Sequence, residues 1–140
     1  MVPRIPDEPP DKELSPGQLH DRFSDVVNLS VAQMKSFIQS DYNRAYLERN
    51  SDMSQPGNKP IEDVIRLANT PRDEWRDVDD GFNEVEQARE MLNFNRRNLG
   101  AIRANGLGKN TLPGDLDDMT MIEAASIRWG VDPDSDIEWD

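Results

Sequence analysis

Apolar residues recur at three- and four-residue intervals along the first part of this chain, which is the spacing of an amphipathic helix. Two such stripes predict helices over about 16–27 and about 31–41. The stripe positions are Leu19, Phe23, Val26 and Val27 in the first helix, and Val31, Met34, Phe37 and Ile38 in the second. Only three residues separate the two segments, so we expect a helical hairpin or corner.

Both helices are predicted to begin at the same local signal. The stretches LSPGQL at 14–19 and LSVAQM at 29–34 each place serine at the N-cap and glutamine three residues later. In such a capping box each side chain accepts a hydrogen bond from the other residue's backbone N–H, and the flanking apolar pair forms a hydrophobic staple. Pro16 at the first helical position fits the same interpretation.

The remaining pattern predicts three further helices and one short turn or helix. One helix begins at Pro60, the short element opens at Thr70, the longest helix spans 81–98 and the last spans about 119–129. The positions expected to face inward in the last helix are Met119, Ile122, Ala125 and Trp129. Gly100 is expected to end the longest helix. Because no stretch alternates as a strand does, we predict an all-α fold of five to six helices in a compact bundle.

The two ends of the chain are expected to lie outside the helical domain, which we place at 15–131. Residues 1–14 are predicted to form an extended proline-rich arm, and residues 132–140 an acidic tail. The tail has aspartates at every second position from Asp132, as a calcium-binding EF-hand loop does. Its sixth position is Ile137 instead of glycine, however, and its twelfth position lies beyond the last residue. We therefore expect no metal site in the tail.

The charge balance points to the environment of the protein. The chain of 140 residues contains 28 acidic and 16 basic residues, for a formal net charge of −12, with 18 aspartates and only 4 lysines. Such a composition suits a salt-rich cytoplasm, because molar salt shrinks the Debye length to ~3 Å and suppresses self-repulsion. We expect a halophilic archaeon or a virus that replicates in one. An ordinary acidic mesophilic protein is the alternative.

Composition also bounds the location of the protein. The chain has no cysteine, which excludes disulfides, thiolate metal sites and a cysteine nucleophile. Its first residues lack the apolar core of a signal peptide, and no run approaches the ~20 apolar residues of a membrane span. We expect a cytoplasmic protein, or part of a virus particle assembled in the host cytoplasm, with no membrane partner.

Residues for catalysis or nucleotide binding do not form a recognisable set. The stretch GLGKNT at 106–111 lacks the glycine that a P-loop needs five residues before its Gly-Lys pair, because this chain has Arg103 there. His20 is the only histidine, and no pair can be singled out among the many carboxylates. We therefore expect a protein that is not an enzyme and that has no cofactor, no metal and no specific small-molecule ligand.

One segment departs from the acidic average. Residues 93–110 contain no acid, and their basic residues are Arg96, Arg97, Arg103 and Lys109. In one interpretation these side chains pair with the protein's own acids and stabilise the C-terminal end of the longest helix. In the other they contact an anionic partner, either a nucleic acid or the acidic face of another protein.

Four motifs resemble, in order, those of an uncharacterised prokaryotic family of small helical proteins, a domain of unknown function. They are FSDVVNLSVAQMKSFI at 23–38, IEDVIRLANT at 61–70, EQAREMLNFNRRNL in the longest helix and SIRWGVDPDSD at 126–136. The first is similar to the family's Val-Asn-Met-Thr opening and the last to its Trp-Gly-His-Asp-Pro ending. Arg128 and Val131 stand where the family has Asn and His. The resemblance implies a helical fold over about 20–135, and family members are sometimes labelled DNA-binding.

These features together predict a non-enzymatic interaction or assembly protein of a halophilic archaeon or its tailed virus, with a virion head or connector protein as one form of the hypothesis. Other protein subunits are the expected partners, and the candidate contacts in the arm and the tail are Pro3, Ile5, Pro6 and Trp139. The alternative is a nucleic-acid-associated accessory protein that uses the basic patch at 96–109. Net negative charge disfavours loose DNA binding, which depends on neutralising phosphates.

Overall fold

The computed structural model describes residues 14–49 and 57–133. Within these residues the fold is all-α, as predicted, and none of the helices is long and apolar enough to cross a membrane. The elements of this part of the chain are α1 (Pro16–Val26), α2 (Val31–Ile38), α3 (Asp41–Arg49), α4 (Lys59–Ala68), the 3-10 helix η1 (Arg72–Glu74), α5 (Glu84–Asn105), the 3-10 helix η2 (Gly114–Leu116) and α6 (Met121–Ile127).

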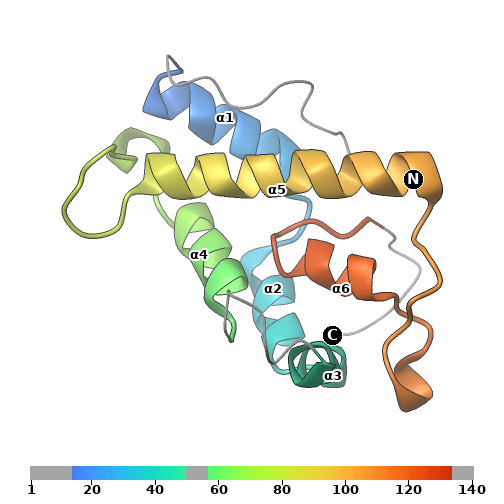
Figure 1. Cartoon of the computed structure of the whole chain (residues 1–140). Coiled ribbons are helices and arrows are strands. Elements are labelled where there is room, and N and C mark those ends of the chain that lie inside the picture. The colour runs from blue at the N-terminus through green and yellow to red at the C-terminus, as the bar shows by residue number, and fades with distance from the viewer. Residues whose placement is uncertain (1–13, 50–56, 134–140) are drawn as a thin grey trace.

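Helix α5 is the longest element and lies across the whole molecule (Figure 1). It contacts α1 on one side and α4 and α6 on the other, while α2 packs on α4 and α3 packs on α6. Its buried residues include a series with alternating three- and four-residue spacing, namely Val85, Ala88, Leu92, Asn95, Leu99 and Ile102. This heptad seam keeps one face of α5 against its neighbours over nearly the whole length of the helix.

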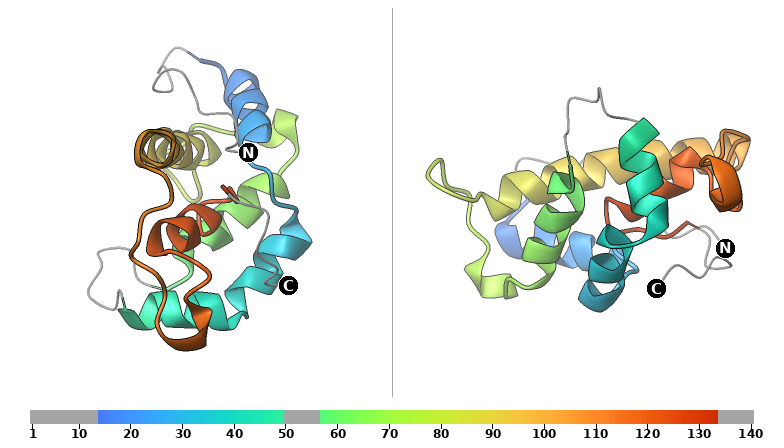
Figure 2. Two further views of the ribbon diagram at one scale, coloured as in Figure 1. Left: turned by 90° about the vertical axis from the view of Figure 1, so that its right-hand side faces the viewer. Right: turned by 90° about the horizontal axis from the view of Figure 1, so that it is seen from below.

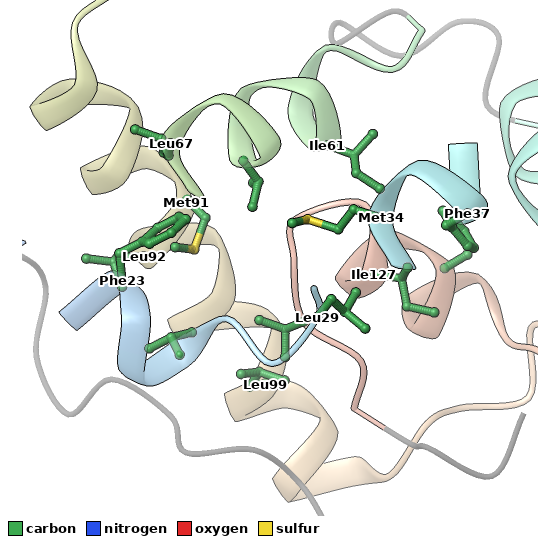
Figure 3. Close-up of a cluster of buried hydrophobic side chains, with 14 of the residues drawn as sticks. Phe23, Leu29, Met34, Phe37, Ile61, Leu67, Met91, Leu92, Leu99 and Ile127 are labelled. Atoms are coloured by element: carbon green, nitrogen blue, oxygen red, sulfur yellow. The ribbon is translucent and has the colours of Figure 1, made fainter. Parts of the chain in front are cut away.

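The core lies along this seam and receives side chains from all six described α-helices. Near one end of the close-up, Phe23 of α1 lies with Leu67 of α4 and Leu92 of α5 (Figure 3). Near the other end, Met34 of α2 lies with Ile61 of α4. Of the stripe residues predicted for the first two helices, those that are buried are Leu19, Phe23, Val26, Met34 and Phe37, and those that are half-buried are Val27, Val31 and Ile38.

The two predicted capping boxes are present. Ser15 and Gln18 exchange hydrogen bonds of 2.9 and 3.2 Å at the start of α1. Ser30 and Gln33 exchange bonds of 2.9 and 3.1 Å at the start of α2. Each pair satisfies two backbone N–H groups that have no partner within the helix, which explains why both helices begin where the sequence indicates.

The prediction of one helix over 31–41 is wrong at its C-terminal end. Helix α2 ends at Ile38, and a separate helix that was not predicted, α3, begins after two residues. Ser40 marks this break, since its hydroxyl donates to the Phe37 carbonyl at 2.7 Å and accepts from the Asn43 N–H at 3.2 Å. One serine thus ends one helix and caps the next. Helix α3 is mostly polar, so it lacks the apolar stripe from which a helix is inferred.

The longest helix begins and ends later than predicted. Helix α5 starts three residues later, behind an N-cap at Asn83, and continues through Gly100 to Asn105. Gly100 does not stop the helix, because the next turn is held in the core by the buried side chain of Ile102. The chain leaves the helix at Gly106, whose φ of +75° suits glycine.

The inward face predicted for the last helix is only partly right. The residues that α6 buries are Glu123, Ala124, Ser126 and Ile127. Ile122, Ala125 and Trp129 are only half-buried, and Met119 is buried but precedes the helix. A capping box between Thr120 and Glu123, with bonds of 3.1 and 3.2 Å, sets the start of α6 and turns Glu123 inward. The apolar stripe is therefore rotated partly to the surface.

After α6 the chain turns back at Gly130, as the sequence indicates. The φ of Gly130 is +90°, and a Cβ atom there would lie 2.7 Å from a methyl carbon of Val64. Two residues later, the Asn28 side chain exchanges hydrogen bonds of 2.8 and 2.7 Å with the backbone of Asp132. These bonds attach the end of the described chain to the connection between α1 and α2.

Substituting Gly130→Ala should destabilise the fold by about 2–5 kcal/mol, since it combines a left-handed backbone penalty with overpacking against Val64. The matched control is Gly81→Ala, where φ is +81° but no atom lies within 4 Å of the added methyl. That control should cost only the backbone penalty, about 1–2 kcal/mol. Urea denaturation of both variants measures the difference, and equal losses of stability would contradict the packing argument.

Candidate functional site

Three adjoining hollows run along the outer side of α5, next to α6. The first, of ≈ 360 Å³, shares Phe94 and Arg97 with the second, of ≈ 350 Å³. The second shares Ala101 with the third, of ≈ 250 Å³. We call this surface the α5–α6 groove and define it by Phe94, Arg97, Ala101, Ile122 and Trp129. Two of the residues that were predicted to face the core, Ile122 and Trp129, therefore line a surface groove.

An aromatic pair forms one end of the groove. The rings of Phe94 and Trp129 stack with their centroids 4.6 Å apart and their planes inclined by 15°. The Asn95 amide donates to the Trp129 carbonyl at 3.2 Å, and the Asn98 amide lies 3.5 Å from the Ile122 carbonyl. These amides hold the segment of α6 by its backbone, so that Ile122 and Trp129 pack partly against the core and partly line the groove.

A buried arginine lies at the aromatic end. Arg128 is 4% exposed, and its guanidinium lies 4.7 Å from the centre of the Tyr46 ring and donates to the Gly57 carbonyl. Its Nε atom has no hydrogen-bond partner among the described residues. Burial lowers the pKa of Arg128, because desolvation disfavours the charged form. Arg97 and Glu90 line the same hollow, so two guanidinium groups and one carboxylate surround it.

The structure divides the predicted basic patch between two sides of α5. Arg97 lines two of the hollows and Lys109 lines the third. Arg96 and Arg103 are one heptad apart and share the flank nearly opposite to Phe94, because each residue turns the helix by about 100°. Within residues 14–49 and 57–133, no carboxylate forms an ion pair with any of these four side chains. Arg97, Arg103 and Lys109 are exposed, and Arg96 is half-buried.

The predicted partner contacts in the arm and the tail cannot be placed. Pro3, Ile5 and Pro6 of the predicted arm and Trp139 of the predicted tail lie outside the described residues. The acidic positions of the tail from residue 134 onward lie outside them as well.

The described residues also include the only histidine of the chain, which lies away from the groove. His20 packs edge-on against Trp75, with ring centroids 4.9 Å apart, and its nearest described carboxylate is that of Asp21 at 3.7 Å. No group of three or more metal-ligating side chains occurs among the described residues. The groove offers aromatic and aliphatic surface beside Arg97 and Lys109, neither of which forms an ion pair with a described acid, so it can bury an apolar side chain and attract an anion.

One pattern in the sequence indicates the groove, although the predictions above did not include it. Phe94 and Ala101 are one heptad apart and lie outside the heptad seam of α5, so they form a second apolar strip on the same helix. A second strip on a long helix indicates either another packed element or an exposed contact surface. The position of α6 decides between these two possibilities, and only the structure supplies it.

Comparison with protein-family models, with curated proteins and with solved structures finds no match for this chain. The resemblance to the helical family of unknown function therefore stays a prediction. The groove has to be interpreted from its own residues.

Replacing Arg128 with lysine should destabilise the protein by about 1–3 kcal/mol, because an ammonium group cannot lie flat on the Tyr46 ring while it donates to the Gly57 carbonyl. The matched control is Arg97→Lys, an exposed site in the same hollow, which should change the unfolding free energy by less than about 0.5 kcal/mol. Urea denaturation measures both. If Arg128→Lys leaves the unfolding free energy unchanged, this guanidinium does not anchor the pocket.

Proposed function

We propose that this protein is a non-enzymatic interaction or assembly component, and that the α5–α6 groove is the surface with which it binds a partner protein. The observation that carries the proposal is the half-exposed aromatic stack of Phe94 and Trp129, which continues into the apolar surface of Ala101 and Ile122. Contiguous apolar surface that a fold leaves at its exterior is typical of protein contact sites.

The charge of the molecule supports the choice of partner. The chain carries a formal net charge of −12, yet the groove is bordered by Arg97 and Lys109. A protein segment that combines apolar and acidic side chains matches both properties. In the proposed halophilic cytoplasm, salt screens the ionic part over ~3 Å, so most of the affinity would come from apolar burial.

The proposal extends to the source and the assembly. The Asp-rich, Lys-poor composition supports a halophilic archaeon or its tailed virus. In the viral form of the proposal, the protein is a head or connector component of a particle assembled in the host cytoplasm, and its partners are other subunits of that particle.

Charge reversal at Arg97 tests the groove. Arg97→Glu should reduce partner recovery at least about tenfold, because it places a carboxylate in direct contact with the partner's acids, at a separation that molar salt screens least. Arg103→Glu is the matched control, an exposed arginine of the same helix on the other flank with the same change in net charge. Tagged protein from the natural source, purified at the growth salt, is compared by quantitative mass spectrometry. Equal recovery of the same partners with both variants would contradict the proposal.

A second candidate is a nucleic-acid-associated accessory protein. It is favoured by the four basic side chains at 96–109, none of which pairs with a described acid. Arg97 and Arg103 lie on different flanks of α5 and Lys109 lies in the loop after it, which counts against one continuous phosphate-binding surface. This candidate predicts DNA binding at low salt that weakens steeply as salt rises, and that Arg96→Glu with Arg97→Glu abolishes. No binding to a duplex at 20 mM salt removes this candidate.

A further inference from the structure

The last seven residues of the chain, DSDIEWD, have the chemistry that the α5–α6 groove accepts. They contain four acids, and the only apolar side chains among them are those of Ile137 and Trp139. In an extended peptide, residues two apart point to the same side, so Ile137 and Trp139 would share one face and the neighbouring acids the other. The groove presents an apolar floor with Arg97 and Lys109 at its border, and in the first hollow the two guanidinium groups of Arg97 and Arg128 outnumber the one carboxylate, that of Glu90.

We propose that the α5–α6 groove of one copy of this protein binds the C-terminal residues 134–140 of a second copy. Trp139 packs against the stacked Phe94 and Trp129 rings, and the acids beside it face Arg97. The first hollow, of ≈ 360 Å³, is at the small end of the range for binding pockets and matches a single large aromatic side chain. This inference rests on the proposed function, because it names the partner for the same groove.

The point at which the described chain ends favours a second copy over the same copy. Asp132 is bonded to Asn28 in the connection between α1 and α2. In the left view of Figure 2, the segment after α6 runs between α6 and this connection, whereas the loop after α5 lies on the other side of α6. To enter its own groove, the C-terminal segment would therefore have to pass around α6.

The length of the segment makes that path unfavourable. Residue 139 is six residues beyond Pro133 and can lie at most ~20 Å from it. Half the circumference of a helix with its side chains is ~17 Å, for a diameter of 10–12 Å. Passing around α6 would use nearly all of this reach. Ile137 would then lie beside α6 on the way to the groove and could not enter the groove together with Trp139. A second copy has no such restriction.

The contact joins two different surfaces, a segment on one copy and a groove on the other. If two copies exchange their C-terminal segments, such contacts form a closed dimer. Otherwise each copy binds the next and an open-ended oligomer forms. Either outcome makes the molecular mass depend on protein concentration, which gives the inference a direct readout.

Sedimentation velocity on the full-length protein at the salt of its natural source tests the inference. Wild type should self-associate as its concentration rises, while Trp139→Ala and Arg97→Glu should each weaken the association at least about tenfold, as expected for a central aromatic and a matched charge. Arg103→Glu should associate as wild type does. A wild type that stays monomeric at ~1 mM, or association that Trp139→Ala does not change, would overturn the inference.

A synthetic peptide of residues 134–140 provides the second arm. It should bind the full-length Trp139→Ala variant, and the same peptide with alanine for tryptophan should bind at least about tenfold more weakly. If wild type is monomeric and the peptide nevertheless binds the Trp139→Ala variant, the segment occupies the groove of its own copy. This result would overturn the second-copy inference. Loss of the native partners with Arg97→Glu in the absence of self-association would leave the proposed function standing and refute only this inference.

Discussion

The heptad seam of α5 is the constraint on which the rest of the structure depends. Only 35% of the residues of this acidic chain are hydrophobic, so one helix that buries side chains along nearly its whole length provides the common surface for α1, α4 and α6. Asn95 is the polar member of the seam and is fully buried. Its amide donates to the Trp129 carbonyl, so the same seam that holds the core together also positions the end of α6.

The groove follows from the way in which α6 is attached to this seam. Two asparagine side chains of α5 hold the segment of α6 through its backbone carbonyls, and the capping box at Thr120 turns Glu123 toward the interior. The apolar side of α6 is consequently shared between the core and the surface. Ile122 and Trp129 join Phe94 at the surface of a strongly charged molecule, and this is the observation on which the proposed partner contact rests.

The parts of the fold that depend on local signals could be predicted from the sequence, and those that depend on tertiary context could not. The capping boxes at Ser15 and Ser30 were predicted because each is complete within a few residues. Helix α3 was missed because its sequence is mostly polar. Gly100 was expected to end the longest helix, but the helix continues because Ile102 in the next turn is buried in the core. The sequence also presented 96–109 as one basic patch, whereas helical rotation places Arg97 and Arg103 on different flanks.

The accessibility of the groove in the assembled protein tests the central claim most directly. Because the chain has no cysteine, a single introduced thiol reports on one position. Ala101→Cys in the groove can be compared with Ala32→Cys, an exposed alanine of α2 that lines none of the three hollows. The account predicts that alkylation of the first variant is at least about tenfold slower in its native assembly than in the isolated monomer, while the second is unchanged. Equal rates for the groove position in both states would contradict it.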